Sequence, residues 1–194
     1  MHLQSHLAAS WIVGSALEHR RDRRLVAWAG VVPDLDALAV LGGVDAFGRW
    51  HHVLTHGLLA AVVTAGAALA LATPASSPVR AAPWADSGRL RTALLAFAAF
   101  HLHLALDLLG SGVGWRIAYL YPFSSDDVGI TWGWALASWQ NVLATVAFIG
   151  WSLRMAVTAR RSFVEAWMPA SVDAAFCALV RRTWARVTAA SGTP

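Results

Sequence analysis

The sequence predicts an all-α fold: a polytopic membrane helical bundle with a C-terminal amphipathic surface helix. Of the 194 residues, 57% are hydrophobic and only 13% are charged, whereas soluble domains are about 25% charged. Apolar runs close to the length of a membrane span alternate with short polar segments. A final segment repeats apolar residues at helical spacing, with Arg residues among them. Together these observations indicate a membrane protein that ends in a basic helix.

The first elements are short. Residues 7–17 are apolar but too few to span a membrane comfortably, so we expect a re-entrant or strongly tilted helix. Residues 18–24 form a charge run with four Arg, which we interpret as a solvated cytoplasmic loop. Four later runs have about the length of a span, and polar or Gly-rich segments join them. These four predicted spans are residues 25–44, 53–72, 92–109 and 130–153.

The C-terminal segment changes character after Arg160. Pro169 precedes a run of apolar residues at helical spacing, and Ser171 is a suitable helix cap. Arg181, Arg182 and Arg186 lie among the apolar positions, as in helices that lie on an anionic membrane surface. We therefore divide the chain into a membrane-embedded domain, 1–158, and a cytoplasmic amphipathic tail, 159–194.

The distribution of Arg predicts the orientation. If all four spans cross, one side receives only Arg49 and Arg116, and the other side receives the remaining Arg residues of the loops and the tail. The Arg-rich side should be cytoplasmic, which predicts a multi-pass protein of the bacterial inner membrane. Because the Arg residues sit at the ends of apolar runs, they fit a topology signal and not a nucleic-acid footprint.

His103 and Asp107 lie four residues apart inside an apolar run, so on a helix they project from one face and could share a metal ion. Ionisable groups at membrane depth usually mark function. The alternative is a hydrogen-bonded polar pair that holds two helices together. The lone Cys177 excludes a metal site built from Cys residues.

Other segments bring similar groups to the same predicted depth, on the extracytoplasmic side. Imidazoles and carboxylates without thiolates suit a divalent ion such as zinc, and their number allows a second ion. Asp34 and Asp36 are two apart, so both reach one centre only if the backbone is irregular. His51 reaches it only if the residue precedes the helix. The candidate metal ligands are His6, Asp34, Asp36, His51, His56, His103 and Asp107.

The order of these motifs resembles the YdjM-like family of inner-membrane metal-dependent hydrolases, also described as LexA-regulated. The resemblance covers residues 1–125 and rests on His6, Pro33-Asp34-Leu35-Asp36, His51-His52-Val53-Leu54-Thr55-His56, His103-Leu104-Ala105-Leu106-Asp107 and Tyr121-Pro122-Phe123-Ser124. It implies that His6, one of the two Asp residues, His56, His103 and Asp107 are ligands. A more distant likeness to zinc-dependent phospholipases C implies that Asp107 bridges two ions.

Three positions depart from the family pattern. His52 stands where the family usually has Arg, Gly57 stands where Ser is common, and His101 has no counterpart. We expect a hydrolase that uses a metal-activated water on a phosphoester or lipid substrate, with Asp36 and His52 as the candidate catalytic groups. The alternatives are a metal or proton transporter, which would need more polar residues toward the cytoplasm than Gln140 and Asn141, and a non-catalytic scaffold.

Overall fold

The computed structural model describes residues 2–74 and 86–190, and this part of the chain is almost entirely helical. The predicted all-α membrane fold is confirmed. The only strands in the described residues are two-residue segments that pair antiparallel, with Arg116 opposite Gly129. In order, the elements are α1 (Leu3–Gly14), α2 (Arg20–Ala29), η1 (Val32–Gly42), α3 (Val44–Trp50), α4 (Leu58–Leu71), α5 (Ser87–Gly110), β1 (Arg116–Ile117), β2 (Val128–Gly129), α6 (Trp139–Thr158), η3 (Phe163–Ala166) and α7 (Ala170–Ala190).

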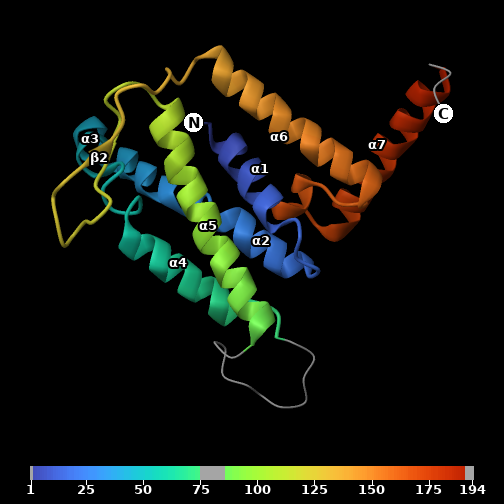
Figure 1. The fold of residues 1–194 in the computed structure, drawn as a ribbon, viewed down its shortest axis with the longest axis horizontal. Helices are drawn as coiled ribbons and strands as arrows, with labels where there is room; N and C mark the ends of the chain where they lie inside the picture. Colours follow the sequence, from blue (N-terminus) through green and yellow to red (C-terminus); the bar gives the residue numbers. More distant parts are fainter. Residues whose placement is uncertain (1, 75–85, 191–194) are drawn as a thin grey trace.

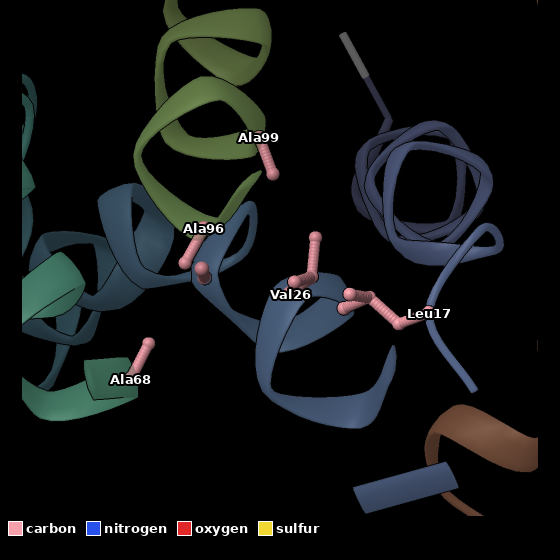
Figure 2. Close-up of a cluster of buried hydrophobic side chains, with 6 residues drawn as sticks. Leu17, Val26, Ala68, Ala96 and Ala99 are labelled. Atoms are coloured by element: carbon pink, nitrogen blue, oxygen red, sulfur yellow. The ribbon is translucent and has the colours of Figure 1, made fainter. Parts of the chain in front are cut away.

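Helix α5 lies at the centre of the bundle and packs against α1, α2 and α4 (Figure 1). Up to Ala99 its buried positions are small residues, Thr92, Ala93, Ala96 and Ala99, which allow the backbones of neighbouring helices to approach closely. Beyond them the larger side chains of Phe100, His103 and Leu104 are buried. One buried cluster joins four segments through Leu17, Val26, Ala29, Ala68, Ala96 and Ala99 (Figure 2). At Gly30 a Cβ atom would lie 1.7 Å from Ser10 Oγ, so α1 can approach this turn only because the residue is Gly.

The expectation of four full-length spans is wrong. Among the described residues, only α5 and α6 are long and apolar enough to cross a membrane, and α2 with η1 forms a third candidate bent by 52°. Helix α4 starts at Leu58 because the turn before it pairs with a distant loop: Leu58 N donates to Tyr119 O at 2.8 Å. Helix α6 starts at Trp139, where the Ser138 side chain accepts from Asn141 N as an N-cap.

The charge run at 18–24 was expected to be a loop, and this expectation is also wrong, since α2 begins at Arg20. The polar side chains of this helix have partners elsewhere in the fold. Asp22 accepts from the backbone N–H and the hydroxyl of Thr73, at 2.8 and 3.0 Å. Arg23 pairs with Glu165, which is 142 residues away in the sequence. Long-range contacts therefore make the Arg run part of a packed helix.

Glu165 in η3 is the acceptor of a buried hydrogen-bond cluster that fastens the C-terminal segment to the bundle. Its side chain is 1% exposed and accepts from Trp11 Nε1 at 2.8 Å. Arg23 donates to both carboxylate oxygens, at 2.5 and 2.7 Å. The chain after Thr158 therefore first returns to α1 and α2 before α7 begins.

The predicted surface helix near 171–188 is confirmed as α7. It extends away from the bundle beyond the C-terminal end of α6 (Figure 1). Leu179, Trp184 and Val187 remain more than half exposed on it, and they face Leu153 and Val157 of α6 across an open apolar hollow.

The buried ion pair predicts that a Glu-to-Gln substitution lowers the stability of the protein at position 165 but not at an exposed position. In Glu165→Gln the Arg23 guanidinium stays buried and loses its counter-charge, which should lower the free energy of unfolding by about 3–5 kcal/mol. The measurement is the thermal unfolding midpoint of the detergent-purified protein. The matched control is Glu18→Gln at an exposed position, which should change stability by less than about 0.5 kcal/mol. Equal midpoints for the two variants would contradict a stabilising role for the pair.

Candidate metal centre

Four side chains from three segments place their ligand atoms within 4.8 Å of one another: Asp34, His56, His103 and Asp107. His56, His103 and Asp107 are buried, and Asp34 is partly exposed. Asp34 lies in η1, His56 in the turn before α4, and His103 and Asp107 near the C-terminal end of α5. The predicted convergence of His56, His103 and Asp107 on one point is therefore present in the fold.

The backbone of Gly30 fixes the orientation of His103. Its Nδ1 lies 2.8 Å from Gly30 O, and a carbonyl oxygen only accepts, so Nδ1 carries the proton. The other nitrogen, Nε2, lies 3.1 Å from Asp107 Oδ2 and 3.6 Å from Asp34 Oδ1. Among the residues described, this buried Nε2 has no hydrogen-bond partner. In the neutral ring, the lone pair on this atom faces two carboxylates.

Asp36 fixes the orientation of His56, because it contacts Nδ1, the ring nitrogen that faces away from the ligand group. Its Oδ2 lies 2.9 Å from His56 Nδ1, and its Oδ1 lies 2.7 Å from His51 Nδ1. The backbone N–H of His52 donates to the same carboxylate at 2.9 Å. His56 Nε2 then points toward Asp107 Oδ2 at 3.6 Å, and it too has no hydrogen-bond partner within the described chain. Of the two Asp residues, Asp34 thus lies among the ligand atoms, and Asp36 orients the imidazoles.

Thr55 ties this turn to η1. Its hydroxyl donates to Pro33 O at 2.5 Å and accepts from the N–H of Asp36 at 3.1 Å. The two aspartates of the Pro33–Asp36 turn therefore keep a fixed position relative to His56. The side chain acts as a structural link between η1 and the segment before α4.

Asp107 lies at the centre of the site. Besides the two imidazoles already described, His6 Nε2 lies 3.1 Å from Oδ1, and Ser111 Oγ donates to the same oxygen at 3.1 Å. The rings of His6 and His103 stack with centroids 3.8 Å apart. His6 is therefore at the edge of the group, bonded to one of its carboxylates. Ser111 was missed by the sequence analysis, although it follows Asp107 at the same four-residue spacing that identified the His103–Asp107 pair.

His51 and His52 lie outside the group of four. His51 is bonded to Asp36. His52 has a left-handed backbone, with φ of 68°, and its ring packs 4.2 Å from that of Trp115 and 4.4 Å from that of His56. Burial, together with the neighbouring His56 and His51, lowers the pKa of His52 to about 3, so this ring is neutral at physiological pH. It does not supply the permanent positive charge of the Arg that the resembled family usually has there.

His101 points away from the site, because residues two apart on a helix project from nearly opposite faces. Its two ring nitrogens lie 2.9 Å from Phe97 O and 2.9 Å from the Tyr119 hydroxyl. It connects α5 to the segment that pairs with the start of α4. The residue therefore supports the loop around the site and contributes no ligand atom.

The donor atoms fit a divalent cation. In neutral His56 and His103 the proton is on Nδ1, so both Nε2 lone pairs face carboxylate oxygens at 3.1–3.6 Å. Lone pairs and carboxylates repel one another, and a polar pair that only held helices together would place a hydrogen between them. A cation bound by two imidazole nitrogens and two carboxylates removes that repulsion, and this donor set is typical of zinc, iron or manganese sites.

Comparison with known protein families gave one match. A family model described as YdjM inner membrane protein matches residues 1–185, which extends the resemblance noted above beyond the motifs and into α7. No curated protein and no solved structure matches the chain.

The geometry predicts graded losses of bound metal. Asp107→Asn keeps the size of the side chain but removes the charge at the centre of the group, so the purified protein should contain almost no stoichiometric divalent metal. Asp36→Asn removes the orienting carboxylate and should weaken metal affinity by about 10–100-fold without abolishing it. The measurement is elemental analysis followed by titration of the apo-protein with zinc.

The control for that series is His101→Gln, on the same helix and outside the group. It should retain the metal content of the unmodified protein. If Asp107→Asn also retained it, His103 and Asp107 would be a hydrogen-bonded pair between helices and not metal ligands.

Proposed function

Since the chain belongs to the YdjM inner membrane protein family, we propose that it is a membrane-bound, metal-dependent hydrolase that cleaves a phosphoester or lipid substrate. The observation that carries the proposal is the pair of buried imidazole Nε2 atoms that face two carboxylates and have no hydrogen-bond partner in the described chain. A metal ion in this position supplies two things: it polarises an oxygen of the substrate, and it lowers the pKa of water into the neutral range.

In this proposal the residues have separate tasks. Asp34, His56, His103 and Asp107 bind the ion, with zinc the metal best suited to the mixed donor set. Asp34 is the most exposed of the four, at 26% of its side chain, so substrate approaches from its side. Asp36 keeps the His56 ring in the binding orientation. If two ions are bound, His6 and a bridging Asp107 are the residues that would extend the site.

The surroundings of the site favour a substrate at the membrane interface. Helix α3 and the loop after α5 lie at the end of the bundle where α5 ends (Figure 1). Large apolar side chains remain exposed on both and on η1. Exposed apolar residues in such number are uncommon on a water-facing surface and are expected where a protein contacts lipid. The five most exposed are Leu41, Val44, Val113, Phe123 and Trp132, between 69% and 85%.

The transporter alternative has less support. It needed polar groups that continue from the site toward the other end of the bundle, and Asn141 was the main candidate. This residue is buried, and its amide donates to Gly110 O at 2.7 Å and to Leu136 O at 2.8 Å. It therefore satisfies carbonyl groups at the end of α5 and in the following loop, which is a structural task.

The proposal includes an orientation, with the site on the extracytoplasmic side and the start of α5 on the cytoplasmic side. Ser87→Cys and Ser125→Cys, each in a Cys177→Ser background, place one thiol at an exposed position on either side of α5. In intact cells a membrane-impermeant maleimide should label position 125 and not position 87. The opposite pattern would reverse the orientation and place the site in the cytoplasm.

The activity itself is tested with detergent-solubilised protein on phospholipids and on chromogenic phosphodiesters. We expect hydrolysis that a chelator abolishes and zinc restores, and that falls at least about 100-fold in Asp107→Asn, the scale of losing a residue essential to charge stabilisation. The control, Asp127→Asn in an exposed loop, makes the same chemical change outside the site and should keep full activity. A metal-loaded protein with no chelator-sensitive activity on either substrate class would overturn the hydrolase proposal while leaving the metal site intact.

A further inference from the structure

A second polar feature lies on α2, near the opposite end of the bundle from the candidate metal centre. It is a hollow of about 350 Å³, here called the α2 pocket, and its lining is Arg20, Arg21, Arg24, Leu25 and Trp28. It borders the C-terminal segment, because Trp28 Nε1 and Arg24 Nε both donate to Ala166 O, at 2.8 and 3.1 Å. The proposed hydrolase activity uses none of these side chains.

The α2 pocket carries uncompensated positive charge. One neighbouring carboxylate, Glu165, is already bound by both Arg23 and Trp11 and lies 3.8 Å from Arg20 Nε. A second, Asp173, interacts with Arg20 and accepts from Ser162. Arg20 and Arg24 otherwise donate to backbone carbonyls, which hold the guanidiniums in place without neutralising them. Across the described ranges, neither Arg21 nor Arg24 pairs with a carboxylate. The N-terminus of α2 adds to the positive potential, so the pocket is suited to an anion.

The order of residues along α2 distinguishes a lipid from a soluble anion. Positions 21, 24, 25 and 28 recur at the spacing of a single helix face. The guanidiniums occupy the first turns, and Leu25 and Trp28 follow in the apolar C-terminal half of the helix, with Trp28 46% exposed. A soluble phosphate would contact only the guanidiniums, whereas a phospholipid presents a charged group followed by an apolar chain in this same order.

We propose that the α2 pocket binds the headgroup phosphate of an anionic phospholipid from the leaflet at the Arg-rich end of the bundle. Arg21 and Arg24 bind the phosphate oxygens, because a guanidinium offers two parallel donors to such a group. The acyl chain lies along Leu25 and Trp28. The bound lipid thereby contacts the junction at which η3 is fastened to α2.

If the Arg residues of α2 only set the orientation of the protein in the membrane, positive charge at this end of the bundle would be enough and no pocket would be needed. Arg91 at the start of α5 and Arg160 after α6 supply such charge, and both are exposed and outside the α2 pocket. They are therefore matched controls for Arg21 and Arg24, since the same double substitution to Gln removes the same net charge at each place.

The experiment is native mass spectrometry of the full chain, delipidated in mild detergent and titrated with phosphatidylglycerol or with zwitterionic phosphatidylcholine. The unmodified protein should retain one phosphatidylglycerol more tightly than any further lipid. Arg21→Gln/Arg24→Gln should weaken this first binding about tenfold or more, the scale expected for two Arg contacts to an anionic lipid. Arg91→Gln/Arg160→Gln should change it less than about twofold.

The single variant Arg21→Gln shows whether weaker lipid binding by the double variant results from misfolding. Its guanidinium makes no ion pair in the described chain, so the variant should fold normally and still bind phosphatidylglycerol several-fold more weakly. An equal loss in the Arg91/Arg160 control, or equal retention of phosphatidylcholine by the unmodified protein, would overturn the proposal. Displacement of the lipid by millimolar inorganic phosphate would show a site for a soluble anion and would also overturn it.

Discussion

The Asp107 carboxylate places a negative charge inside the bundle, and three imidazoles from separate segments converge on it. Burying an uncompensated charge costs more free energy than the whole stability of a typical domain. The segments that carry the three imidazoles must therefore keep fixed positions relative to Asp107. Much of the packing serves this requirement. The turn after α2 carries Gly30, where α1 comes so close that a side chain would collide with Ser10. The carbonyl of the same residue fixes the ring of His103. Close packing and ligand orientation therefore depend on one glycine.

The sequence was sufficient for the parts of this arrangement that follow helix periodicity. His103 and Asp107 share a face of α5, and a helix with apolar residues at helical spacing, α7, follows near the C-terminus. It could not separate Asp34 from Asp36, because their segment is a 3₁₀ helix. With about three residues per turn, positions two apart project roughly 120° from each other. The Asp34 carboxylate therefore lies in the ligand group, while the Asp36 carboxylate contacts Nδ1 of His56.

The incorrect expectations have a common physical origin in contacts between residues far apart in the chain. From local sequence alone, the Arg run at 18–24 is predicted to be a loop. Its helical structure depends on the distant Glu165, which pairs with Arg23. The predicted span at 53–72 loses its first turn because that turn pairs with residues 118–119. Hydrophobic runs locate apolar segments, but long-range hydrogen bonds decide where each helix begins. The C-terminal segment shows the same effect, since its first residues belong to the packed bundle before α7 departs from it.

The ligand set has a consequence for the biogenesis of the protein. Its members span positions 34–107 in the sequence, and His6 contacts it from the first helix. Ribosomes deliver the N-terminal segments to the membrane first, so Asp34, His56 and His6 enter before their central partner on α5 has been synthesised. During that interval these groups must remain hydrated or protonated. If the group binds a metal ion as proposed, loading has to follow insertion of α5, because the earlier segments alone do not complete the set of ligand atoms.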